Sequence, residues 1–277
     1  MTGGSYCATV RFNRDGSIDR NFGDNGRVQT LIGAAESCGG RSVFITPDGK
    51  IIVAGTIRFG NGQHASAVIR YLPDGTPDRQ FGQDRIADAL GPNISDTTAV
   101  SAAVDSQGRV IVVGSQPLSY PSSRFWLARY DTDGKLDRSF GENGIVAFHD
   151  SAGSQILFGV ALQPDGKIVA AGGDFPEQCE SCPPVANKVD RIAVVRLNVN
   201  GSIDETFADD GFLFISSPRF RWGARGIAIQ PDGKLLIVGD VFEQGTGRPP
   251  PPSPIILMRL NQDGTPDRGF GTGDDMH

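Results

Sequence analysis

Long apolar runs and blocks of positive charge are absent from this sequence of 277 residues. Its apolar stretches, such as IIVAG from Ile51 and LLIVG from Leu235, have the length of a strand and are far shorter than a bilayer span. Lys and Arg number 26 against 32 Asp and Glu, a formal net charge of -6. Without a basic stretch there is no electrostatic footprint for a phosphate backbone, so we expect no membrane span and no nucleic-acid partner.

Catalytic signatures are absent as well. There is no G-x-S-x-G elbow, no phosphate-binding loop and no H-E-x-x-H helix, and the three histidines, His64, His149 and His277, are isolated in the sequence. The start, MTGGSYCATVRF, has neither the basic nor the apolar region of a secretion signal. These absences weigh against an enzyme and favour a binding or scaffold protein, and no catalytic residue, metal site or cofactor is predicted.

One phrase occurs five times, as RFNRDGSIDRNF from Arg11, RYLPDGTPDRQF, RYDTDGKLDRSF, RLNVNGSIDETF and RLNQDGTPDRGF. In each copy an Arg precedes an Asp by eight positions, and a Phe follows that Asp by three. The turn glycines of the five copies are Gly16, Gly75, Gly134, Gly201 and Gly264. Constant spacing inside the phrase and variable spacing between copies predict one structural unit with insertable loops.

A second phrase alternates with the first, as ITPDGKIIVAG, VDSQGRVIVVG, LQPDGKIVAAG and IQPDGKLLIVG. Each copy predicts a tight hairpin of two apolar strands, and the first phrase predicts two more strands around its D-G or N-G turn. Four antiparallel strands in a unit of roughly 60 residues, without a helical pattern between units, predict an all-β protein, a β-propeller of four-stranded blades with about four to five units. A β-solenoid is the second choice.

The phrases PDGKIIVAG and RYLPDGTPDRQFG resemble the delta-60 repeat family and look like a longer relative of the NHL propeller repeat, from Tyr6 to Gly271. The resemblance implies a propeller and export, to the bacterial cell envelope or the extracellular space. It carries no established activity.

Residues present in every copy solve a problem that every blade has, so we interpret the repeated phrase as structural. The Phe residues are predicted to form the core between blades, and each Arg to pair with the Asp of its own unit. The turn acids are expected to bond nearby backbone N–H groups. A calcium array is the alternative, although one carboxylate per turn falls short of the six to eight oxygens that calcium takes. The turn acids are Asp15, Asp74, Asp133 and Asp263.

We predict a single propeller domain over 1–277, with a half blade at 1–40, blades at 41–98, 99–155 and 156–222, and a partial blade at 223–277. A clasp between the two ends would close a ring of four blades. An open segment would instead expose blade edges and allow self-association.

Function is expected where the repeat varies, on the face that holds the loops between the second and third strands. Residues eight positions before each hairpin Gly should lie near the channel mouth, and the sequence PRFRWG adds cationic and aromatic side chains. We expect a glycan, peptide or protein ligand. The residues at the four mouth positions are Arg41, Val100, Phe158 and Arg225. The candidate ligand-binding residues are Arg41, Arg225, Arg221, Trp222, Phe158 and His64.

Alternatives remain for this face. The two Arg residues are either solvated or paired with Glu36 and Asp96, and Trp222 is either exposed or buried between blades. The rival function is a calcium-dependent hydrolase of the lactonase type, for which Glu36, Asn93 and Asp174 would be the nearby ligands.

The four cysteines predict two disulfides, which agrees with export. Cys7 begins the third strand of the first unit and Cys38 follows its fourth strand, so the two are expected to be close. Cys179 and Cys182 form CESC in the longest loop. Zinc would need four ligands, of which a lone C-x-x-C supplies two.

Overall fold

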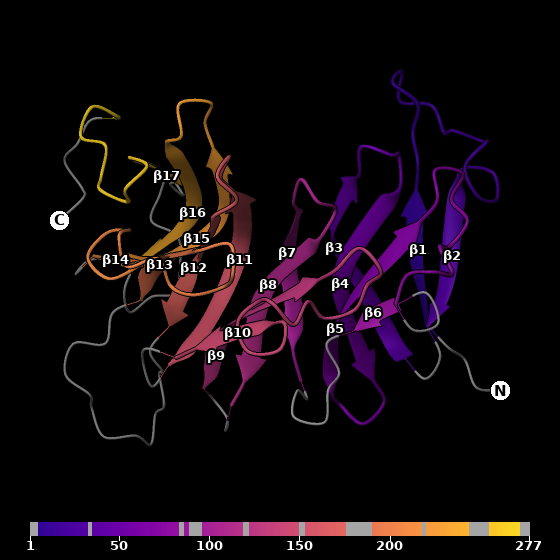
Figure 1. Cartoon of the computed structure of the whole chain (residues 1–277), viewed down its shortest axis with the longest axis horizontal. Coiled ribbons are helices and arrows are strands. Elements are labelled where there is room, and N and C mark those ends of the chain that lie inside the picture. Colours follow the sequence, from indigo (N-terminus) through magenta and orange to yellow (C-terminus); the bar gives the residue numbers. More distant parts are fainter. Residues whose placement is uncertain are drawn as a thin grey trace. The chain divides into compact units, whose positions relative to one another are not determined.

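The computed structural model describes residues 5–32, 35–82, 86–88, 96–118, 122–149, 153–175, 190–217, 220–243 and 255–271 (Figure 1). These ranges contain strands and turns and no helix, which confirms the all-β prediction. No helix long and apolar enough to cross a membrane occurs in them. The chain divides into two compact units. Unit 1 comprises Met1–Val112 and Ala128–Asp137, and unit 2 comprises Val113–Leu127 and Arg138–His277.

Unit 1 holds two antiparallel sheets. The smaller pairs β1 (Ser5–Val10) with β2 (Arg27–Ile32). The larger has the order β3 (Ala35–Ile45), β4 (Ile51–Phe59), β5 (His64–Tyr71) and β6 (Ile86–Asp88). β7 (Thr98–Val104) also lies in this unit, and the division between the units passes through β8 (Val110–Pro117) and β9 (Ser123–Tyr130).

Unit 2 continues with β10 (Ile145–Phe148), which pairs with β9. An antiparallel set follows in chain order, namely β11 (Ser154–Leu162), β12 (Ile168–Phe175), β13 (Arg191–Leu197) and β14 (Phe212–Ser216). The last sheet has three strands, β15 (Phe220–Ile229), β16 (Leu235–Glu243) and β17 (Ile255–Leu260). The β3–β6 and β11–β14 sets confirm the predicted four antiparallel strands in a repeat.

The D-G turns are closed by their own acidic or amide side chains. Asp74 accepts a hydrogen bond from the backbone N–H of Thr76, and Asn200 accepts one from Ser202. In the third copy Asp131, two residues earlier than the expected Asp133, accepts the N–H groups of Asp133 and Lys135. Each turn Gly has a positive φ, for example 90° at Gly75, a conformation that glycine adopts without steric cost. The turn-forming role is therefore confirmed for Asp15, Asp74 and Asp263, whereas Asp131 takes it in place of Asp133.

The Arg of each phrase pairs with the Asp of its own repeat, and Arg11, Arg70 and Arg196 also reach the next repeat. In unit 1, Arg70 Nε lies 2.9 Å from Asp78 Oδ2, and its guanidinium lies 4.4 Å above the ring of Phe81. The Nη1 group of the same Arg donates to the carbonyl of Thr132, in the following turn. In unit 2, Arg196 pairs with Asp204, lies above Phe207 and donates to the carbonyl of Gln262. We call this arrangement the repeat joint, and it confirms the predicted Arg–Asp pair.

The Phe of each joint packs against the turn Gly of the next repeat. A Cβ atom on Gly134 would lie 2.7 Å from the backbone N of Gly82 and 3.0 Å from the ring of Phe81. The backbone N–H of Gly82 donates to the carbonyl of Asp133 in the same turn. These turns therefore need glycine for two reasons, a positive φ and a close neighbour. The joint Phe side chains that are fully buried are Phe22, Phe81, Phe140 and Phe207.

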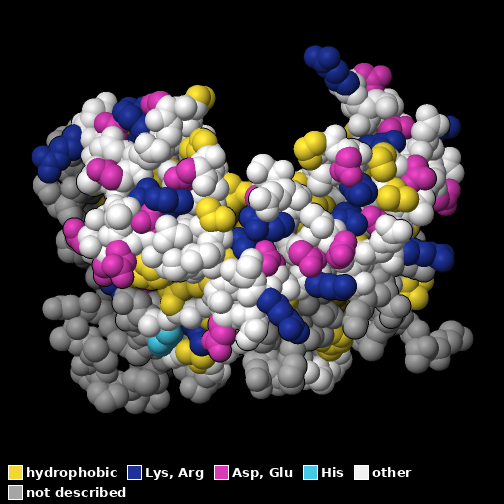
Figure 2. All heavy atoms as spheres, viewed as in Figure 1, with side chains coloured by type: hydrophobic (Ala, Val, Ile, Leu, Met, Phe, Trp, Pro, Cys, Tyr) yellow, Lys and Arg dark blue, Asp and Glu magenta, His cyan; other side chains and the backbone are white. Residues whose placement is uncertain are grey.

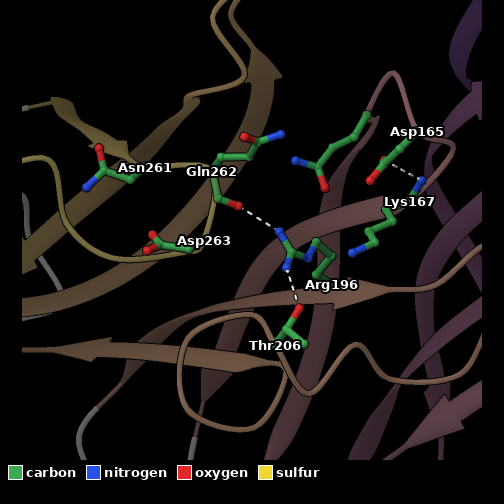
Figure 3. A pocket seen from close by; sticks show the side chains of 8 residues that line it. Asp165, Lys167, Arg196, Thr206, Asn261, Gln262 and Asp263 are labelled. Atoms are coloured by element: carbon green, nitrogen blue, oxygen red, sulfur yellow. Dashed lines mark hydrogen bonds between the residues drawn. The ribbon is translucent and has the colours of Figure 1, made fainter.

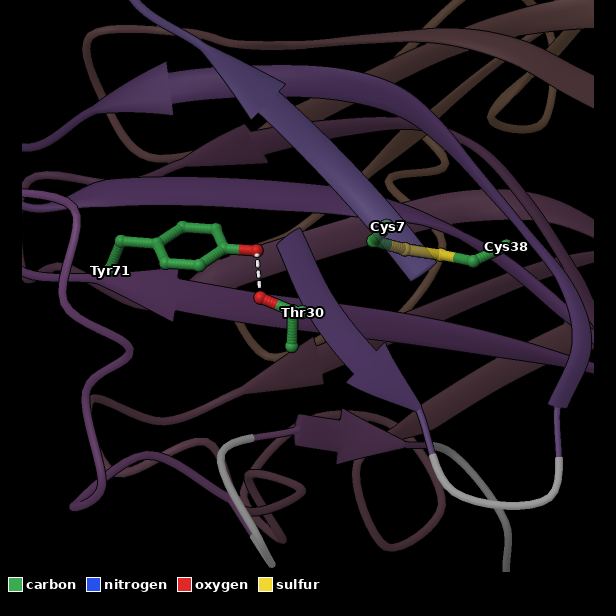
Figure 4. The surroundings of a disulfide bond; sticks show 4 residues. All are labelled: Cys7, Thr30, Cys38 and Tyr71. Atoms are coloured by element: carbon green, nitrogen blue, oxygen red, sulfur yellow. Dashed lines mark hydrogen bonds between the residues drawn. A yellow bond between two sulfur atoms is a disulfide. The ribbon is translucent and has the colours of Figure 1, made fainter. Parts of the chain in front are cut away.

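A disulfide and a buried hydrogen bond attach the two-stranded sheet to the rest of unit 1 (Figure 4). Cys7 in β1 is bonded to Cys38 in β3, as predicted, with their Cα atoms 5.4 Å apart. The hydroxyl groups of Thr30 in β2 and Tyr71 in β5 lie 2.7 Å apart, both buried. The predicted Cys179–Cys182 bond lies outside the described residues.

Candidate functional site

The first strand of a repeat carries a β-bulge at the position where the sequence predicted the channel mouth. Register shifts occur between Gly40 and Ser42 in β3, between Leu157 and Gly159 in β11, and between Ala224 and Gly226 in β15. The extra residue is the predicted one in all three cases, because it stands between the two residues of each pair. A bulge re-aims a side chain out of the regular alternation of a strand. The residues at these bulges are Arg41, Phe158 and Arg225.

A glycine in the second strand makes room for each bulge. A Cβ atom on Gly172 in β12 would lie 2.0 Å from the carbonyl O of Ile156, and one on Gly239 in β16 would lie 2.4 Å from that of Gly223. Gly55 in β4 has the same contact with Gly39. The Gly that ends IIVAG, IVAAG and LLIVG is thus the sequence signal of the bulge, a signal not used in the prediction of the site.

In unit 2 two bulge residues lie together. The guanidinium of Arg225 lies 4.4 Å from the centre of the Phe158 ring, and Arg225 Nε lies 2.5 Å from Asp240 Oδ2 on the neighbouring strand β16. The Arg225 and Asp240 side chains are each 43% exposed, and Phe158 is half-buried. An ion pair this exposed contributes little stability. We call these three residues the bulge cluster.

The predicted ion pairs with Glu36 and Asp96 are wrong. Glu36 lies 3.5 Å from Arg58, and Asp96 accepts hydrogen bonds from the backbone N–H of His64, while its Oδ1 lies 3.0 Å from His64 Nδ1. Arg225 pairs instead with Asp240, because antiparallel pairing places Asp240 opposite Gly223, close to the bulge. In unit 1, Arg41 is exposed, and no contact among the described residues joins it to His64.

Trp222 is buried in the core of unit 2 with Ile237, Val241 and Met258. Its indole Nε1 has no hydrogen-bond partner among the described residues. This burial favours the packing alternative for Trp222 over an exposed place on the rim. The side chain of Arg221, and the whole of Arg219, lie outside the described residues.

Of the residues suggested as metal ligands, Glu36 and Asp174 form ion pairs with Arg side chains, and the third is not described. Asp174 is buried and its Oδ2 lies 2.7 Å from Nε of Arg191, whose guanidinium lies 3.7 Å above the Phe214 ring. Asn93 lies outside the described residues. Within the described ranges no group of three or more His, Cys, Asp or Glu side chains is placed to hold a metal ion.

A polar cavity of about 470 Å³ opens beside the joint of unit 2, on the side of the D-G turns (Figure 3). Arg196 and Thr206 lie between the Asn261–Asp263 turn and the Asp165–Lys167 turn. Its lining residues are Gln163, Asp165, Lys167, Arg196, Thr206, Asn261, Gln262 and Asp263. The sequence does not reveal this cavity, because the cavity arises where turns from two repeats meet.

The two cationic side chains of this cavity form ion pairs with the same buried carboxylate, that of Asp204. Lys167 Nζ lies 2.8 Å and Arg196 Nε 2.6 Å from Asp204 Oδ2. Burial acts to raise the pKa of Asp204, but hydrogen bonds from Lys167 and Thr206 and the charge of Arg196 outweigh it, so the pKa is held well below the usual value. Cations neutralised in this way are poor receptors for an anion. More widely, Figure 2 shows Lys and Arg intermixed with Asp and Glu on the face drawn.

A family model of known proteins agrees with this fold. The family model "Domain of unknown function (DUF5122) beta-propeller" matches residues 46–81, 107–140 and 185–207. No curated protein matches the sequence. A solved "Hypothetical protein from leishmania major" is 15% identical, with 85% of this chain and 70% of that chain covered and a TM-score of 0.44. A "Crystal structure of glucose dehydrogenase" is 14% identical, with 86% and 90% covered and a TM-score of 0.40. The repeated antiparallel strands and the family match show a fold of the β-propeller type.

Proposed function

We propose that the protein is a non-catalytic binding module whose bulge cluster takes a carboxylate group of a glycan or peptide ligand. The observation that carries the proposal is variation at one position. The joint residues recur in every copy, whereas the position eight residues before the hairpin Gly holds Arg41, Val100, Phe158 and Arg225 in turn, and three of these four stand at a bulge. A bulge aims these side chains out of the sheet, which is the placement that recognition on a rigid scaffold requires.

The chemistry of the bulge cluster favours a carboxylate ligand. Arg225 has five N–H donors in a planar fork, and it binds Asp240 through Nε. Because that ion pair is exposed and weak, a ligand carboxylate can join or replace Asp240 at small cost. The half-buried ring of Phe158 offers an apolar surface for the part of the ligand next to the carboxylate.

Arrays of acidic and neutral glycans and of acidic peptides, probed with the whole chain, test this function. We expect acidic probes to bind, and Arg225→Gln to weaken that binding by at least about tenfold, or about 1.4 kcal/mol. Arg138→Gln is the matched control, since Arg138 is an exposed Arg of the same unit. Equal losses in both variants, or binding unchanged in Arg225→Gln, would contradict the proposal.

We also infer that the protein works outside the cytoplasm. The Cys7–Cys38 disulfide supports this location, because such bonds persist in oxidising compartments. Thiol labelling of the protein in fractionated cells tests the inference. Labelling of both cysteines in a cytoplasmic pool would oppose it.

A further inference from the structure

The outer face of the last sheet exposes side chains whose counterparts in the preceding repeat are completely buried. Ile255 and Leu257 in β17 are 77% and 54% exposed. Their counterparts 63 positions earlier, Ile192 and Val194 in β13, are both 0% exposed and belong to the core that packs against the last sheet. The same pairing of strands places Val238 of β16 beside Leu257, and Val238 is exposed as well. This sheet therefore presents an apolar surface of the kind that a following repeat covers.

The first repeat exposes the complementary surface. Phe12 is 61% exposed, whereas the residues at its position in the four later copies are all 0% exposed. Val10 and Tyr6, on the same side of β1, are also exposed, and Tyr6 pairs with exposed Leu31 of β2. The counterparts of Phe12 are Tyr71, Tyr130, Leu197 and Leu260.

The repeat joint is also incomplete at both ends of the chain: the last joint lacks a following turn, and the first turn lacks a preceding joint. Phe270 is only half-buried, although the other four joint Phe side chains are fully buried, and Gly271 N–H has no backbone acceptor among the described residues. At the other end, the space around the Cβ position of Gly16 is empty to 4 Å, whereas Gly75 and Gly134 meet a Phe ring there. Arg259 pairs with Asp267 and lies above Phe270, as in a filled joint.

We propose that the last sheet and open joint of one molecule bind the first turn and first sheet of a second copy of this chain, head to tail. Each surface is exposed on its own unit, and the two match position by position the surfaces that meet between consecutive repeats. In the contact Gly16 of the second copy lies on the Phe270 ring. Arg259 donates to the carbonyl of Arg14, the counterpart of Pro73, and Gly271 N–H donates to that of Asp15, the counterpart of Asp74.

This contact uses sheet faces rather than pairing between strand edges. It is heterologous, since a different surface of each copy takes part, so every dimer keeps one open face at each end. Such contacts either close into rings or extend into larger assemblies. The contact is separate from the bulge cluster, and its test is independent of ligand binding.

Sedimentation of the whole chain over a range of concentrations tests the proposal. We expect the wild-type mass to rise to that of a dimer or more. Gly16→Asn should shift this rise to at least tenfold higher concentration, because Asn accepts the positive φ of 83° while its side chain blocks the Phe270 ring. Gly62→Asn is the matched control, since Gly62 has the same φ of 83° and empty space within 4 Å. A wild type that stays monomeric, or a Gly16→Asn variant that associates like the wild type, overturns the proposal.

A mixture of two variants identifies the surfaces. Phe270→Ala damages the open joint and Gly16→Asn damages the turn, so each variant alone should be monomeric at the concentration at which the wild type first forms dimers. An equal mixture should form dimers, because Gly16→Asn keeps the joint and Phe270→Ala keeps the turn. A mixture without dimers overturns the proposed pairing.

Hydrogen exchange of the wild-type protein tests the same contact without a substitution. Raising its concentration should protect amides in residues 8–18 and 255–271. Protection elsewhere, with these two segments unchanged, overturns the contact.

Discussion

At the scale of single residues, the repeated phrase works because each side chain has several partners. The joint Arg binds an Asp of its own repeat, lies on a Phe ring and donates to a carbonyl of the next repeat, as Arg196 does in unit 2. Charge-assisted hydrogen bonds of this kind are stronger than neutral ones and fix geometry. The turn Gly completes the joint by letting the Phe approach the backbone.

Gly134→Ala tests the double role of the turn glycine. We expect a loss of at least about 2 kcal/mol in the free energy of unfolding, because the new Cβ atom meets both a positive φ and the backbone of Gly82. Gly62→Ala meets the positive φ alone and should cost about 1 kcal/mol. Urea unfolding measures both variants. Equal losses would show that packing against Phe81 contributes nothing.

The joint carboxylates make stability depend on acid pH. Lys234, the Gly269 N–H and Arg259 hold the pKa of Asp267 at about 2, and the pKa of Asp204 is also lowered. A carboxylate with a depressed folded-state pKa stabilises the fold above its unfolded pKa of about 4, and this stability is lost as pH falls through the folded value. We therefore expect the free energy of unfolding to fall between pH 4 and pH 2.

Asp204→Asn should lower stability at pH 7 and flatten this acid dependence, as followed by urea unfolding at a series of pH values. Asp209→Asn, at an exposed carboxylate of the same unit, should keep the wild-type profile. A wild-type slope in Asp204→Asn would exclude this carboxylate as a source of the pH dependence.

At the scale of elements, the two-stranded β1–β2 sheet is the part of unit 1 most in need of attachment. Two strands alone are marginally stable in water. This sheet is held by the Cys7–Cys38 bond, by the Thr30–Tyr71 hydrogen bond and by packing of Phe22 and Val28 into the unit 1 core. Its stability therefore depends on contacts with β3–β6 rather than on its own ladder.

Replacing both Cys7 and Cys38 by Ser should lower the free energy of unfolding by about 2–4 kcal/mol, because the bond closes a loop with a sequence separation of 31 residues. Urea unfolding without reductant measures the loss. Dithiothreitol should lower the free energy of unfolding of the wild type toward that of the variant. A variant as stable as the oxidised wild type would contradict a stabilising role.

At the scale of the whole molecule, the acids of the repeated turns accept hydrogen bonds within their own turns. Asp15, Asp74 and Asp263 each accept a backbone N–H two residues on, and the pKa of each is lowered by bonds from the Ser or Thr at that position. A carboxylate engaged in closing its turn is less available to coordinate calcium.

Thermal melting in EDTA and in millimolar calcium, on the oxidised protein, tests this view of the whole chain. We expect equal melting temperatures. A calcium site filled at about a hundred times its dissociation constant would add roughly 2.7 kcal/mol and raise the melting temperature by several degrees. Such a shift would contradict the turn role of the acids and support the rival metal-dependent hydrolase.

The sequence by itself determined the all-β fold, the turn positions, the Arg–Asp–Phe unit and the Cys7–Cys38 pair. These features depend on short spacings within a repeat, or on strands whose order the repeat makes plain. Counting back from the hairpin Gly selected Arg41, Phe158 and Arg225 as residues of a channel mouth, because the repeat carries one register throughout. That a bulge occurs at these positions was not predicted.

Only the tertiary structure decided which side chains meet. The partner of Arg225 is Asp240 rather than Asp96, and Trp222 is buried. A bulge inserts one residue and so reverses the side-chain alternation of its strand. The partner of the bulge residue then depends on which residue of the neighbouring strand lies beside it, and the alternation along the chain does not reveal that partner. The joint needed the structure for the same reason, since Arg70 and the Thr132 carbonyl are 62 positions apart and meet only when two repeats pack together.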